Sequence, residues 1–445
     1  MLSIAEIPSY ETCKESGVDW LGAIPSDWNV KPGMVAFTES KRDNKGMKES
    51  RVLSLSYGRI IVKPEEKLVG LVPESFETYQ LVDPGDIIVR CTDLQNDQTS
   101  LRTGLAKDKG IITSAYLNLK VNQGYDARYM HYYLHALDAS KVLYKFGTGL
   151  RQNLSFFDFK RLPVLDIPLQ WQVDIAKFLD KKTTQIDEAI AIKEQQIALL
   201  KERKQIIIQK SVTQGLDPTV PMKDSGVDWI GKIPAHWEVK QLKHLLSEPL
   251  KYGANESGVD YQPELPRYIR ITDFSGDGQL SDEKKLSLPW RVGREYLLGD
   301  SDILLARSGA TVGKSYQFKK SMSNESSHCF AGYLIKATAD NSKMISDYLY
   351  LYLGSDCFTA WKSLIFNKAT IENIGADKYA SLFVVVPPLS EQKEILGLVR
   401  EKLNPISLSI DTFLDQIRKL KEYKTTLINS AVTGKIRITP DMVEA

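Results

Sequence analysis

The segment KESGVDWLGAIPSDWNV, residues Lys14–Val30, recurs further along the chain as KDSGVDWIGKIPAHWEV, residues Lys223–Val239. Of these 17 positions, 11 are identical at a constant offset of 209 residues. Self-similarity at a fixed period indicates that one structural unit occurs more than once in the chain. The chain has 445 residues, which is enough for about two to four domains.

A second repeated block lies further along each half. Residues Pro168–Asp187 align with Pro388–Ser407 at an offset of 220, and the same offset places Leu199–Thr213 on Lys419–Thr433. Between the matched blocks the two halves share little. Two copies of one domain could repeat without symmetric function, but free divergence would erode the matched blocks as well. We therefore expect two similar scaffolds that present two different surfaces.

The block after Pro168, and its copy in the second half, is predicted to be helical. Thr184 with Asp187 three residues later is typical of a helix start, and Asn404–Pro405 supplies a cap and a first-turn proline in the copy. We therefore predict a short helix at about 170–181 and a longer one at about 185–213, matched by 390–401 and 405–433.

Apolar residues recur along both longer segments at alternating spacings of four and three. A 3.5-residue period is typical of a coiled-coil seam, whereas a helix that packs only on its own domain carries a wider stripe. Because both helices have the same seam, we expect them to pair antiparallel as a spacer about 43 Å long. The expected seam residues are Ile186, Ile190, Ile197, Leu200, Ile207, Ile406, Ile410, Phe413, Ile417, Leu420 and Leu427.

The composition is that of an ordinary globular protein, with 42% hydrophobic and 26% charged residues and a net charge of +2. No segment approaches the ~20 apolar residues of a membrane helix, and the start, MLSIAEIPSYETCKESG, lacks the layout of a signal peptide. The four cysteines form no C-x-x-C pair, which argues against a zinc site and fits a reducing cytosol. We therefore expect a cytoplasmic protein without a metal site; its charge neither requires nor excludes nucleic acid.

Three motifs could indicate catalysis. GATVGKS (Gly309–Ser315) is one residue short of a phosphate-binding loop, and no helix is expected after it. DFSGDG (Asp273–Gly278) resembles the cofactor loop of methyltransferases but does not open a helix. His131 and His135 have metal-ligand spacing but lack the glutamate of the zinc-hydrolase motif, so core histidines are the better interpretation. We therefore expect no catalytic residues in this chain.

The repeats SGVDWLGAIPSDWNV and SGVDWIGKIPAHWEV, with the helix ends QKSVTQG and NSAVTGK, resemble the specificity subunit of type I restriction–modification enzymes. VDPGDIIVR, LRTGLA and GIITSAYLNLK in the first insert, and DILLARSGATVGKS in the second, resemble target-recognition domains. The resemblance covers nearly the whole chain. It implies an α+β fold with two mixed α/β target-recognition domains, separated by two long antiparallel coiled-coil helices in a pseudo-two-fold internal repeat.

The resemblance also implies partners. Each recognition domain would read one half of a bipartite site in double-stranded DNA, and the paired helices would set the spacer and dock two methyltransferase subunits. Those subunits would bring S-adenosylmethionine and methylate adenine, and a restriction subunit would join through them, so this non-catalytic chain binds no cofactor itself. The expected parts are the first repeat segment and recognition domain (1–168), spacer helices (169–213), linker and second repeat segment (214–234), second recognition domain (235–388), second spacer helices (389–433) and tail (434–445).

Basic and amide side chains in the insert loops are the candidates for DNA contact, because such groups pair with base edges and phosphates, although many charged loops are merely solvated. Arg90 and Arg307 end matching strands, so each is expected to pair with a nearby aspartate or to contact phosphate; Asn153 and Asn373 are expected to cap turns. The candidates in the first insert are Lys41, Arg42, Lys48, Arg51, Arg90, Thr92, Gln95, Arg102, Thr103, Arg151 and Gln152. Those in the second insert are Arg267, Arg270, Thr272, Arg307, Ser308, Thr311, Lys314, Asn367 and Lys368.

Two other functions stay open at this point. A self-sufficient DNA methyltransferase or nuclease would need a cofactor loop and a catalytic dyad, and the sequence shows neither. A pseudo-symmetric scaffold that binds only proteins would explain the helix seam, but it would not explain basic loops on two unlike inserts.

Overall fold

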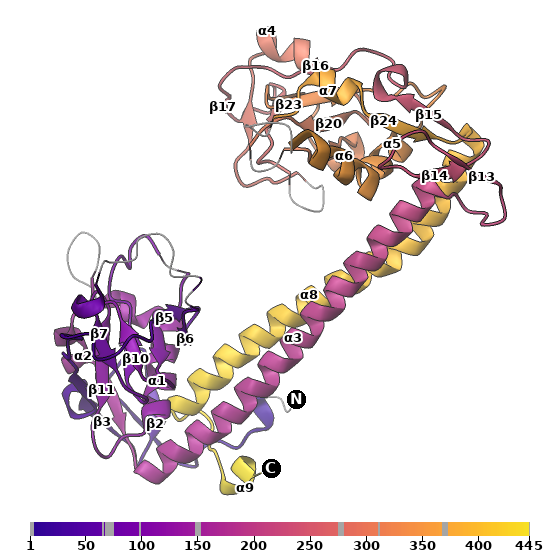
Figure 1. The fold of residues 1–445 in the computed structure, drawn as a ribbon. Helices are drawn as coiled ribbons and strands as arrows, with labels where there is room; N and C mark the ends of the chain where they lie inside the picture. Colours follow the sequence, from indigo (N-terminus) through magenta and orange to yellow (C-terminus); the bar gives the residue numbers. More distant parts are fainter. Residues whose placement is uncertain are drawn as a thin grey trace. The chain divides into compact units, whose positions relative to one another are not determined.

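The computed structural model describes residues 4–64, 66, 75–97, 99–146, 153–274, 280–309, 312–366 and 373–444. Two helices of 45 and 44 residues, α3 (Leu169–Thr213) and α8 (Leu389–Val432), are the longest elements (Figure 1). The chain divides into two compact units, Met1–Lys193 with Leu414–Ala445 (unit 1) and Glu194–Phe413 (unit 2). Each unit therefore contains one insert and a part of each long helix.

Each long helix is continuous, so the predicted separation into a short and a longer helix is wrong. Thr184 is exposed inside α3, and Asp187 accepts from Lys424 of α8 instead of capping a helix start. Pro405 lies inside α8, although a proline there removes one main-chain hydrogen bond. Tertiary packing outweighs the cap signals at Thr184 and Asn404–Pro405. The apolar face of α8 continues through the helical turn at Pro405, where Ile406 is buried directly after the proline.

The two long helices run antiparallel and contact each other within each unit. In unit 1, Lys193 donates to Gln416 at 2.5 Å and Lys424 donates to Asp187 at 2.7 Å. The residue earlier in α3 therefore pairs with the residue later in α8, which is the antiparallel arrangement. The predicted fold class, with its antiparallel helix pair, is confirmed. The seam positions Ile186, Ile190, Ile197, Ile406, Ile417 and Leu427 are buried, and Leu200, Ile207, Ile410, Phe413 and Leu420 are half-buried.

Unit 1 contains a four-stranded antiparallel sheet in the order β4-β11-β8-β9, flanked by two-stranded pairs and short helices. The sheet strands are β4 (Phe37–Glu39), β8 (Ile87–Val89), β9 (Thr103–Leu105) and β11 (Leu117–Val121). The pairs are β1 (Cys13–Glu15) with β2 (Ala23–Pro25), β3 (Asn29–Pro32) with β12 (Pro163–Asp166), β5 (Leu53–Ser56) with β6 (Arg59–Val62), and β7 (Gln80–Val82) with β10 (Gly110–Ile112). The helices are α1 (Ala127–Ala139), α2 (Phe156–Arg161) and α9 (Pro440–Glu444).

Unit 2 contains the corresponding sheet in the order β16-β23-β20-β21 and a second sheet that unit 1 lacks among its described residues. The first sheet comprises β16 (Lys251–Tyr252), β20 (Ile303–Ala306), β21 (Ser315–Gln317) and β23 (Leu334–Ala337). The second comprises β17 (Val259–Asp260), β18 (Arg267–Ile269), β19 (Leu286–Ser287) and β22 (His328–Phe330), with β18 and β22 parallel. The remaining elements are β13 (Met222–Asp224) with β14 (Lys232–Pro234), β15 (Glu238–Gln241) with β24 (Phe383–Val386), and helices α4 (Trp290–Gly293), α5 (Ser346–Leu353), α6 (Asp356–Phe366) and α7 (Ala376–Ala380).

The repeated tryptophan-containing segments pack on the ends of the long helices. Just beyond α3 and α8, Gly215 and Gly434 have left-handed backbones, with φ of 73° and 72°. A Cβ on Gly215 would lie 3.0 Å from the Trp237 ring, and one on Gly434 would lie 2.8 Å from the Trp28 ring. Only glycine combines this backbone conformation with such a close approach. The segment therefore recurs because the same glycine–tryptophan arrangement terminates both long helices.

Candidate nucleic-acid interface

The loop between β8 and β9 carries four of the predicted contact residues, and Arg102 holds it together. Arg102 is fully buried, and its guanidinium donates to four main-chain carbonyls between residues 90 and 97. Its Nε donates to the Tyr144 hydroxyl at 3.0 Å, so all five side-chain N–H groups have acceptors. The expected DNA contact does not fit this placement, because a new partner would require breaking buried hydrogen bonds. Arg102 instead orders the loop that presents Thr92 and Gln95, which are both exposed.

Most of the other predicted arginines pair with carboxylates of their own unit. Arg42 pairs with Asp83 and Asp86, and Arg90 pairs with Asp97 at 3.1 Å. In unit 2, Arg270 pairs with Asp273 at 2.7 Å. The Arg90 pair realises one of the two alternatives expected for that residue. Paired guanidinium groups are already oriented and partly neutralised, which makes them weaker candidates for DNA contact than an unpaired one.

Arg267 is buried in a network of charges and is another expectation that the structure does not fit. Its guanidinium donates to Asp282 and Glu325, both at 3.1 Å. Burial raises the pKa of Glu325, but hydrogen bonds from Lys285 and Ser323 outweigh it and lower that pKa to about 2. The network ties the residues before β19 to those before β22. Arg267 therefore stabilises unit 2 rather than offering a donor at its surface.

The other predicted residues differ in their exposure to solvent. Lys41, Lys48, Arg51, Thr92, Gln95, Thr272 and Lys314 are exposed, Ser308 is half-buried, and Thr103 is buried on β9. Arg151, Gln152, Thr311, Asn367 and Lys368 lie outside the described residues. Asn153 accepts from the main-chain N–H of Asp93 at 2.9 Å, as expected for a residue that caps a turn. That the exposed residues contact DNA stays a prediction.

Arg307 differs from all of these arginines. Its Cζ lies 4.9 Å from the centroid of the Tyr252 ring, its Nε is buried without a partner, and no carboxylate pairs with it among the described residues. The Tyr252 hydroxyl accepts from the main-chain N–H of Ala376 at 2.9 Å, which fixes the ring. A planar guanidinium held on a fixed ring suits a phosphate or a guanine edge. Sequence reasoning missed Tyr252, because no local signal places β16 near the end of β20.

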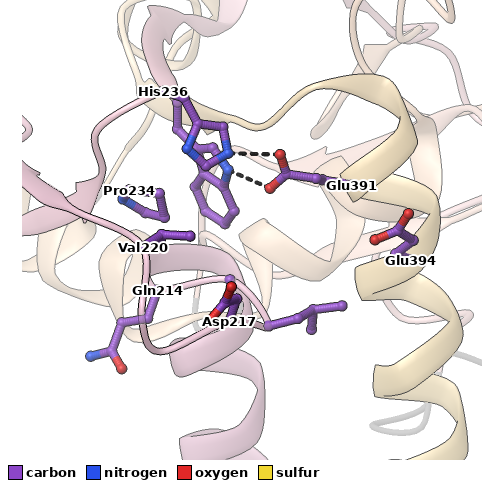
Figure 2. A pocket seen from close by; sticks show the side chains of 10 residues that line it. Gln214, Asp217, Val220, Pro234, His236, Glu391 and Glu394 are labelled. Carbon is purple, nitrogen blue, oxygen red and sulfur yellow. Dashed lines mark hydrogen bonds and ion pairs between the residues drawn. The ribbon is translucent and has the colours of Figure 1, made fainter.

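A cavity of about 230 Å³ in unit 2 lies where the end of α3 meets the start of α8 (Figure 2). There the Glu391 carboxylate accepts from Trp237 Nε1 at 2.8 Å and contacts His236 Nε2 at 2.7 Å. Trp171 stands at the matching position of unit 1, where the Nε1 of Trp28 is buried and has no partner in the described part of the chain. The lining comes from the linker after α3, from the repeated tryptophan-containing segment and from the start of α8, and not from the inserts. The cavity is therefore a feature of the scaffold and not of either candidate recognition surface.

Described residues of the three motifs considered for catalysis are engaged in packing, strand formation or ion pairing within their own units. Burial lowers the pKa of His131 to about 3 and that of His135 to about 4, so both histidines on α1 are neutral at pH 7. The strand β21, not a helix, follows the GATVGKS segment, and Asp273 is engaged by Arg270. Among the described residues, no group of three or more His, Cys, Asp or Glu side chains could hold a metal ion. Within the same residues, no helix combines the length and the apolar character that crossing a membrane requires.

Comparisons with known proteins place this arrangement among its relatives. No protein-family model matches the chain. The chain is 23% identical over 442 residues to the putative type I restriction enzyme MjaX specificity subunit of Methanocaldococcus jannaschii, covering 94% of this chain and 96% of that one. It is also 23% identical over 350 residues to the type I restriction enzyme EcoBI specificity subunit of Escherichia coli, covering 75% and 69%.

One solved structure has a similar fold. It is a chain from work on complex assembly and conformational transition of the type I R-M system, with a TM-score of 0.64 and 15% identity, covering 92% of this chain and 98% of that one. At this identity the likeness shows the fold alone. Together with the sequence relatives, it confirms the resemblance to type I specificity subunits that the repeated segments indicate.

Proposed function

We propose that this chain is the DNA sequence-specificity subunit of a type I restriction–modification complex. The observation that carries the proposal is the combination of two unlike inserts with one repeated scaffold. Each insert contains the same four-stranded sheet, β4-β11-β8-β9 or β16-β23-β20-β21, but the loops at the strand ends differ in sequence and in hydrogen bonding. Equal scaffolds with unequal loops suit a protein that reads two different half-sites on one duplex.

In the proposed complex, recognition comes from loops and spacing comes from helices. Side chains such as Arg307, Thr92 and Gln95 would contact base edges or phosphates, while Arg102 holds the first loop in place. The paired helices α3 and α8 would fix the gap between half-sites and dock two methyltransferase subunits. When one recognition domain is bound, the linked second domain has a high effective concentration at its own half-site, so two modest affinities combine into tight binding.

The chemistry in this proposal belongs to the partners. The methyltransferase subunits would bind S-adenosylmethionine and transfer its methyl group to an adenine that leaves the helix, since a base inside the duplex is out of reach. A restriction subunit would join through them, and the complex would act on DNA in the cytoplasm. The recognition loops would then grip the bases around the target adenine and leave that adenine accessible.

The test is to map methylated adenines in DNA from cells that carry this chain with its methyltransferase. We expect a two-part motif with a fixed gap, and the control is the methyltransferase without this chain, for which we expect no motif. Methylation of a single uninterrupted motif would contradict the proposal. Methyl transfer by the purified chain alone would show instead that the chain is itself a methyltransferase.

A further inference from the structure

Tyr57 occupies a backbone conformation that tyrosine rarely adopts. It forms, with Gly58, the two-residue turn between β5 and β6, in which Ser56 pairs with Arg59. The φ angles are 47° at Tyr57 and 75° at Gly58, so both central residues are left-handed. Turns of this kind favour Asn, Asp or Gly at the first position, because the left-handed conformation is strained for other residues.

The tyrosine ring has no visible structural role that would offset this cost. Tyr57 is 92% exposed and makes no hydrogen bond or ring contact with the described residues of its unit. Large apolar rings contribute to stability through burial, which is absent here. A strained residue whose ring points into solvent is therefore better explained by binding than by folding.

The turn is in contact with α3 on one side and with the β8–β9 loop on the other. Arg59 donates to Asp187 of α3 at 2.6 Å, and Asp187 also accepts from Lys424 of α8 at 2.7 Å. On the other side, a Cβ on Gly58 would lie 3.0 Å from the Leu101 side chain. Leu101 directly precedes Arg102, which orders the loop carrying Thr92 and Gln95. The ring is thus presented on a fixed support beside the candidate DNA-contact loop.

We propose that Tyr57 is a stacking residue, whose ring packs against a nucleobase in the half-site read by unit 1 when the target adenine leaves the helix. The inference rests on the proposed function. Extruding a base leaves a neighbouring base unstacked, and an aromatic ring restores stacking with any base. A ring that is already exposed on a formed turn reaches a base without a rearrangement of the backbone, which lowers the cost of binding.

The experiment uses the complex of this chain with its methyltransferase and two duplexes, each carrying 2-aminopurine in place of the target adenine of one half-site. Tyr57→Asn is the main variant, because Asn suits a left-handed turn and keeps the fold. Tyr57→Phe keeps the ring. The control is Tyr333→Asn, which replaces an exposed tyrosine in the other unit, unit 2. We expect Tyr57→Asn to weaken binding about tenfold and to reduce 2-aminopurine emission at one half-site only, with Tyr57→Phe like the wild type.

The outcomes separate this inference from the proposed function. If the wild-type complex shows no site-specific methylation, the proposed function fails. If the wild type methylates its site and Tyr57→Asn binds and emits equally well, only the stacking role is overturned. Loss of the methyltransferase from the Tyr57→Asn complex in gel filtration would also overturn it, because the ring would then contact protein rather than a base.

Discussion

The Arg307 guanidinium lies over the Tyr252 ring, with 4.9 Å between its Cζ and the ring centroid. Arg90, at the end of the matching strand in unit 1, instead pairs with Asp97 at 3.1 Å. The two arginines therefore occupy equivalent places in the repeat, but only Arg307 keeps its charge without a carboxylate partner among the described residues. Stacking also orients its planar donors in advance, which Lys could not reproduce.

Arg307→Ala is expected to weaken specific DNA binding by about 1–3 kcal/mol, with the effect confined to one half-site. Methylation protection on duplexes that combine intact and altered half-sites measures this. If Arg307 contacts a base, sequence specificity relaxes at one position of the half-site. If it contacts phosphate, the slope of the logarithm of the binding constant against the logarithm of the salt concentration falls by about one, and specificity is kept. Arg90→Ala is the matched control, and a smaller effect is expected there. Equal weakening of both half-sites would contradict the prediction.

Arg102→Ala is expected to act on stability first. Removing the guanidinium takes a donor from four main-chain carbonyls of the β8–β9 loop. The carbonyls of Asp93 and Asp97 keep a second donor, so those of Arg90 and Thr92 carry most of the loss, at about 1–3 kcal/mol for each unsatisfied buried group. We expect a loss of at least about 3 kcal/mol of unfolding free energy in unit 1, measured by denaturant unfolding, with faster proteolysis of residues 90–102. Arg102→Lys should not rescue it, since Lys has only three donors. A variant of wild-type stability that lost only DNA binding would show that Arg102 contacts DNA directly.

The repeated segments were sufficient to predict the scaffold but not the surface. Heptad spacing around Ile186 and Ile406 predicted the paired helices, because a 3.5-residue period depends on sequence alone. The cap signals at Thr184 and Asn404 predicted helix starts wrongly, since packing on both sides outweighs them. The roles of Arg102 and Arg307 depend on which strands become neighbours, and no local pattern contains that information.

Acidification is expected to destabilise unit 2 through Glu325 and His328. Hydrogen bonds from Lys285 and Ser323 lower the Glu325 pKa to about 2, despite burial, so its contribution is complete above about pH 4.5 and is lost as pH falls toward 2. Burial lowers the pKa of His328, whose contribution is likewise complete above its unfolded value near 6.5 and declines below it. Thermal unfolding of the wild type between pH 7 and 2 measures the sum.

Glu325→Gln separates the two groups. At pH 7 it should unfold at a lower temperature than the wild type, because Arg267 loses a buried carboxylate, and its melting temperature should fall less between pH 4.5 and 2. Asp415→Asn is the control, since that carboxylate is exposed on α8. If the melting temperature of Glu325→Gln varied with pH as that of the wild type does, the charge of Glu325 would not contribute to the stability of unit 2.

An exchange of residues between matched positions of the two long helices tests their continuity. Pro405 in α8 and Gln185 in α3 lie 220 residues apart in the repeat, and both are exposed, so a substitution acts mainly through the backbone. A proline inside a helix costs about 3 kcal/mol, because it removes a hydrogen bond and its ring clashes with the preceding turn. Pro405→Gln should therefore stabilise unit 2, and Gln185→Pro should destabilise unit 1 by about that amount. Denaturant unfolding with probes in each unit measures both changes. If a helix instead began at each of these positions, as the cap signals predict, proline would be tolerated at Gln185 and its removal at 405 would bring no gain.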